Sequence, residues 1–88
     1  MQYQTKIQFM DNISKYKKSF VDALSVQEDI VNSKLEYNSI PEWDSIGHMS
    51  LIGALEDEFG ISIDTDDIID FSSFEKGKEI LKKYEVEI

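Results

Sequence analysis

Residues 44–61 read DSIGHMSLIGALEDEFGI, and this stretch decides the fold. An Asp-Ser pair, a run of apolar residues at helical spacing and a closing glycine predict one helix that opens at Asp44-Ser45 and ends at Phe59, before Gly60. On a helical wheel, one face of this helix gathers side chains that suit a protein core. They are His48, Leu51, Ile52, Leu55 and Phe59.

The opposite face of the predicted helix mixes apolar and acidic side chains. An apolar patch with a charged rim is typical of a docking surface, although single exposed apolar residues are common on any protein. Glu56 and Asp57 could equally belong to a solvated face. Weighing the set together, we predict that this surface binds partner proteins through Ile46, Met49, Gly53, Glu56 and Asp57.

Helical patterns also flank this stretch. Apolar residues from Ile13 to Leu24 follow a plausible N-cap at Asp11 or Asn12 and predict a first helix. A short helical turn is expected from Asp64 to Ile69, and Ser72-x-x-Glu75 reads as a capping box for a last helix.

The connection over residues 25–44 is long for a compact domain and is expected to pack across the bundle, with a short helical turn of its own. We therefore predict an all-α fold, a small bundle of three main helices plus one short helix. Residues 11–88 form the domain, and residues 1–10 are an N-terminal lead-in that could join the first helix.

Composition excludes several classes of function. The 88 residues include no Cys, which rules out disulfides and thiolate metal sites, and a net charge of −9 makes nucleic acid a poor partner. No segment is long and apolar enough to span a membrane or to act as a signal peptide, so we expect a cytoplasmic protein. Residues 26–70 hold twelve acidic residues against Lys34 alone, a net charge of −11, which favours basic partners.

The motif Asp44-Ser45-Ile46, followed at the expected distance by Leu55-Glu56-Asp57-Glu58-Phe59-Gly60-Ile61, resembles the acyl carrier protein family. The resemblance covers roughly residues 12–84. It implies that Ser45 carries a covalent 4'-phosphopantetheine arm from coenzyme A, and that Asp44 helps to present Ser45. It also implies a carrier that is not an enzyme, holding acyl groups as thioesters on the arm.

The partners implied by the resemblance are a phosphopantetheinyl transferase and the acyl-loading and acyl-transferring enzymes, with basic docking surfaces. We expect a monomer. Carriers for fatty-acid synthesis typically have Gly-Ala before Asp-Ser-Leu, whereas this chain has Glu42-Trp43. This departure looks more like a dedicated, discrete carrier that serves one pathway, and Trp43 is expected to pack the long connection onto the bundle.

Three other interpretations compete with the carrier. A Ser45–His48 catalytic dyad is suggested by their helical spacing, but His48 falls on the core face and a third member is not apparent. Asp64, Asp66 and Glu75 match part of a calcium-binding loop, which fails where glycine is required. An unmodified acidic helical module for protein–protein interaction is the main alternative to the carrier.

Overall fold

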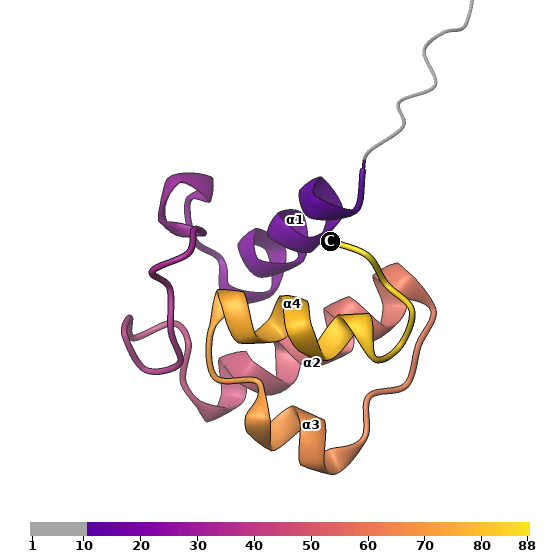
Figure 1. Ribbon diagram of the computed structural model, residues 1–88. Helices are drawn as coiled ribbons and strands as arrows, with labels where there is room; N and C mark the ends of the chain where they lie inside the picture. The colour runs from indigo at the N-terminus through magenta and orange to yellow at the C-terminus, as the bar shows by residue number, and fades with distance from the viewer. Residues whose placement is uncertain (1–10) are drawn as a thin grey trace, which may run out of the picture.

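The computed structural model describes residues 11–88, so the predicted lead-in over residues 1–10 falls outside it. The described chain forms a helical bundle without a β-strand (Figure 1). Its elements, in order, are α1 (Asn12–Leu24), a 3₁₀ turn (Glu28–Ile30), α2 (Ser45–Phe59), α3 (Thr65–Asp70) and α4 (Phe74–Lys82). This confirms the predicted all-α class and the bundle of three main helices plus one short one.

Helix boundaries follow their capping residues. The Asp11 carboxylate accepts a hydrogen bond from the Ser14 amide at 3.1 Å and starts α1, as predicted. Gly60 adopts φ +64° and its amide bonds the Glu56 carbonyl, which ends α2 after Phe59, also as predicted. The predicted turn within residues 25–44 is the 3₁₀ turn.

The predicted start of the last helix is wrong by one residue. The N-cap of α4 is Ser73, whose Oγ accepts from the Lys76 amide at 2.9 Å, and not Ser72. The reason is that the long connection pairs with this segment. The Tyr37 amide donates a 2.9 Å hydrogen bond to the Ser72 carbonyl, and the Phe74 amide donates one of 2.9 Å to the Leu35 carbonyl. That pairing places Ser73 in an antiparallel bridge with Glu36 and keeps it extended, so the helix begins only at buried Phe74.

Aromatic side chains form the centre of the core. The rings of Tyr16 and Phe20 in α1 are both tilted against the ring of Phe74, with centroids 4.9 and 5.4 Å away. The Tyr16 hydroxyl donates a 2.7 Å hydrogen bond to the Phe74 carbonyl, which satisfies it in a buried position. Helix α2 adds Leu51, Ile52 and Leu55, all buried as its apolar face predicts; Phe59 is only partly buried.

The long connection brings Trp43 to the core. Buried Val31 and Leu35 anchor it along the way, and the Trp43 side chain is fully buried against Phe20, 5.3 Å between ring centroids. This confirms that Trp43 packs the connection onto the bundle. Because Trp43 directly precedes Asp44 and Ser45, the same contact fixes where α2 begins.

Candidate functional site

Ser45 is the first residue of α2 and its side chain is exposed. The preceding residue, Asp44, is the N-cap, and its Oδ1 accepts a 2.8 Å hydrogen bond from the Gly47 amide. Asp44 therefore caps α2, in agreement with the predicted opening of the helix at Asp44-Ser45. The arrangement holds the Ser45 hydroxyl at the positive end of the helix, where a negatively charged substituent is favoured.

Gly47 allows the connection to pass close to the first turn of α2. A Cβ at Gly47 would collide with the Glu42 carbonyl oxygen and would lie 3.0 Å from Leu24 Cδ2. This constraint was not predicted from the sequence. The glycine inside the helix, which local propensity disfavours, was the available signal.

An open groove of about 350 Å³ lies beside Ser45. Helices α2 and α3 each supply part of its lining, and the segment after α3 and Tyr37 of the long connection complete it. Most of this lining is apolar. The lining residues are Tyr37, Ser45, His48, Met49, Ile68, Ile69, Phe71 and Ser72.

Both ring nitrogens of His48 have hydrogen-bond partners. Trp43 Nε1 can only donate, and it lies 2.9 Å from His48 Nδ1, so Nδ1 must accept. In the neutral ring the proton then sits on Nε2, which donates to the Ile68 carbonyl at 2.8 Å. This leaves His48 without a lone pair for Ser45, which argues against the dyad and confirms His48 as a satisfied histidine at the core edge.

The outer face of α2 exposes two apolar side chains next to Ser45. Ile46 is 78% exposed and Met49 57% exposed. No atom lies within 4 Å of where a Cβ of Gly53 would stand, so this glycine leaves open space on the surface. Asp57 is exposed. These positions match the predicted surface, and their role in docking stays a prediction.

Glu56 differs from the other residues of that predicted surface. Its side chain is partly buried, and Oε2 accepts a 2.8 Å hydrogen bond from the Ile63 amide in the turn between α2 and α3. The Glu56 carboxylate therefore stabilises the turn that leads into α3, whatever it contributes to binding.

Comparison with family models assigns this region. Residues 43–76 match the model of the phosphopantetheine attachment site. The matched segment starts at Trp43, spans the whole of α2 and α3 and ends in the first turn of α4. Residues 43–76 are thus similar to a phosphopantetheine attachment site.

The attachment site takes a covalent 4'-phosphopantetheine group, and domains that contain it are carriers without catalytic activity of their own. The match therefore confirms the predicted cofactor, the resemblance to acyl carrier proteins and the expectation of a carrier that is not an enzyme. Neither the curated proteins nor the solved structures give a significant match to the chain.

The described residues fit such an attachment site. The exposed side chain at the start of α2 leaves room for a substituent, and Ile68 and Ile69 of α3 line the groove beside it. Within residues 11–88, no group of three or more His, Asp or Glu side chains is placed to hold a metal ion. None of the helices in this range has the length and apolar character of a membrane span.

Proposed function

We propose that the chain is an acyl carrier protein and that Ser45 Oγ is the point of attachment of its phosphopantetheine arm. The observation that carries the proposal is the exposed Ser45 side chain at the first position of α2, inside the matched segment. Ser45 is the serine of the Asp-Ser-aliphatic motif. The hydrogen bond from the Gly47 amide to the Asp44 carboxylate fixes the turn that presents this serine.

Attachment requires one substitution at phosphorus. Ser45 Oγ loses its proton and bonds to the phosphorus that carries pantetheine in coenzyme A. The phosphoanhydride bond breaks, and the adenosine bisphosphate half leaves. A separate transferase with Mg²⁺ supplies the base and the metal, since the resemblance to carriers implies that this chain is only the acceptor. The positive end of α2 stabilises the phosphodiester that forms there.

The bound arm supplies a thiol, which holds an acyl group as a thioester. The residues of this chain provide a surface against which that acyl group can lie. Met49, Ile68 and Ile69 offer apolar surface within the groove beside Ser45. The exposed Ile46 and Met49, with Asp57 further along α2, are proposed to contact basic partner enzymes, since the surrounding segment is strongly acidic.

Intact mass tests the attachment point. The protein is incubated with coenzyme A, Mg²⁺ and a broad-range phosphopantetheinyl transferase. Wild type should gain the mass of one arm, and Ser45→Ala should gain nothing. Ser50→Ala is a matched control, because Ser50 is an exposed serine on the same helix, and it should gain the same mass as wild type. A wild type that gains no mass would favour the unmodified interaction module.

A further inference from the structure

Helix α3 is anchored by a charged side chain. Of its six residues only Asp67 is buried, with 6% of its surface exposed, whereas Ile69 is 72% exposed. Ile68 is partly buried against the core. Burial of a carboxylate is unfavourable unless it is paired and hydrogen-bonded, so the partners of Asp67 determine whether α3 can dock at all.

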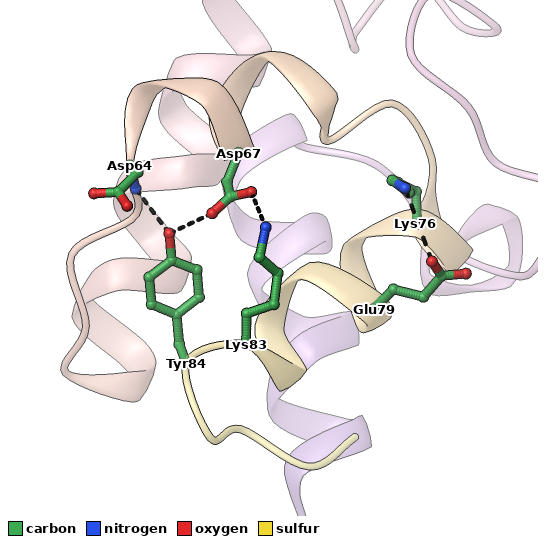
Figure 2. Close-up of polar contacts among 6 residues, drawn as sticks. All are labelled: Asp64, Asp67, Lys76, Glu79, Lys83 and Tyr84. Carbon is green, nitrogen blue, oxygen red and sulfur yellow. Dashed lines mark hydrogen bonds and ion pairs between the residues drawn. The ribbon is translucent and has the colours of Figure 1, made fainter.

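Two side chains at the end of α4 satisfy Asp67 (Figure 2). Lys83 Nζ donates to Oδ1 and the Tyr84 hydroxyl donates to Oδ2, each at 2.6 Å. The Tyr84 oxygen also accepts a 2.9 Å hydrogen bond from the Asp64 amide, at the N-cap of α3. We call Asp67, Lys83 and Tyr84 the Asp67 network. It ties both the N-terminal end and the first turn of α3 to the chain that follows α4.

The other side of α3 is tied to α2. The Ile68 carbonyl accepts the hydrogen bond from His48 Nε2, and His48 lies one helical turn after Ser45. Ile68 and Ile69 line the groove beside Ser45 from the α3 side, while Ser45 and Met49 line it from α2. The position of α3 relative to α2 therefore sets the shape of this groove.

We propose that the Asp67 network holds α3 in place against α2 and thereby sets the width of the apolar groove beside Ser45. Asp67, Lys83 and Tyr84 are positioning residues, since they act on the groove through α3 without lining it. In this arrangement α3 moves as a unit when the network is broken, while α1 and α2 stay packed through their aromatic and aliphatic core. The proposed effect of the groove on a bound acyl group depends on the proposed attachment of the arm at Ser45. The proposed effect of the Asp67 network on the position of α3 does not depend on it.

The test compares amide hydrogen exchange in unmodified wild-type protein and five variants. Asp67→Asn, Tyr84→Phe and Lys83→Met each remove one member of the network, whereas Lys83→Arg keeps a cationic donor. Glu79→Gln is the matched control, because it removes an ion pair on α4, Lys76–Glu79 at 3.8 Å, that lies apart from Asp67 (Figure 2).

We expect the Ile68 amide, which bonds Asp64 within α3, to exchange about tenfold faster in Asp67→Asn and Tyr84→Phe than in wild type. Amides in the middle of α2, such as that of Leu55, should keep their wild-type rates. Lys83→Met should show a smaller acceleration because Lys83 is more exposed, and Lys83→Arg should restore much of the protection. Glu79→Gln should behave as wild type.

A second readout follows the coupling to α2. Trp43 is the only tryptophan of the chain. Its indole donates a hydrogen bond to His48, which in turn is hydrogen-bonded to the Ile68 carbonyl. Release of α3 should therefore change Trp43 fluorescence in Asp67→Asn and leave it unchanged in Glu79→Gln. Wild-type exchange of the Ile68 amide in both Asp67→Asn and Tyr84→Phe would overturn the proposal. So would equal acceleration in α1, α2 and α3, which would make the network a support of the whole fold.

The two proposals can fail separately. The exchange and fluorescence measurements use protein without an arm, whereas the mass measurement at Ser45 does not depend on α3. If Ser45 gains the arm while the Asp67→Asn and Tyr84→Phe variants keep wild-type protection of α3, the carrier function stands and the proposed role of the Asp67 network is overturned.

Discussion

The indole Nε1 of Trp43 donates a 2.9 Å hydrogen bond to Nδ1 of His48, and the two rings stack with an angle of 21° between their planes. Trp43 ends the long connection and His48 lies in the first turns of α2, so this pair joins the two segments that flank Ser45. The same histidine reaches α3 through the Ile68 carbonyl. One imidazole thus connects three parts of the attachment site.

Replacing His48 with leucine should destabilise the domain by about 1–3 kcal/mol, because the buried Trp43 N–H would lose its acceptor. Chemical denaturation gives the change in the free energy of unfolding. In the background of Trp43→Phe, which has no N–H to satisfy, the same His48→Leu change should cost less. Equal costs in the two backgrounds would show that the hydrogen bond contributes little and that packing dominates.

Two glycines of α2 should respond in opposite ways to alanine. Gly47→Ala places a methyl group against the Glu42 carbonyl and should destabilise by about 1–3 kcal/mol. Gly53→Ala meets open space and should stabilise by up to about 1 kcal/mol through helix propensity. Thermal denaturation of the two variants beside wild type checks the sign. A destabilised Gly53→Ala would reveal a contact at that face which the structure does not contain.

Asp67 makes the stability depend on acidic pH. The hydrogen bonds from Lys83 and then Tyr84 hold the pKa of the Asp67 carboxyl below its ordinary value. Its contribution to stability is therefore complete above the pKa of an unfolded Asp, about 3.9, and is lost as the pH falls through the lower folded pKa. The difference in unfolding free energy between wild type and Asp67→Asn should be constant from about pH 6 to 8 and shrink below about pH 4. A difference that grows in acid would contradict this.

Charge on the outer face of α2 should impair binding without affecting the fold. Ile46→Glu and Met49→Glu alter exposed side chains, so circular dichroism should match wild type. We expect each to raise the KM of the phosphopantetheinyl transferase by about tenfold, as loss of a buried apolar contact does in an interface. Ser14→Glu adds the same charge on α1 and should leave KM unchanged. Unaltered KM in both α2 variants would place the docking surface elsewhere.

The start of α1 and both ends of α2 could be predicted from the sequence because local capping residues mark them. Asp11 caps the start of α1, and Asp44 and Gly60 cap the two ends of α2. The start of α4 could not be placed, since Ser72 and Ser73 are both suitable caps and the choice depends on pairing with a distant part of the chain. Local patterns do not contain that tertiary contact.

The same distinction holds at the site. The exposure of Ser45, Ile46 and Met49 follows from their place on one helix, and the wheel predicted it. The partners of Asp67 and the turn held by Glu56 could not be found in this way, because they join residues brought together only by folding. In the sequence, nothing distinguishes Asp67 and Glu56 from the other acidic residues of this strongly acidic segment.

Helix α2 keeps its core residues and the residues of the proposed docking surface on separate faces. Leu51 and Leu55 are fully buried on one side, while Ile46 and Met49 stand in solvent on the other. Under the proposed docking role, substitutions on the solvent side would change which enzymes the protein binds without weakening its interior. A library of variants that changes only those outer positions would test which enzymes the protein can bind while its core stays the same.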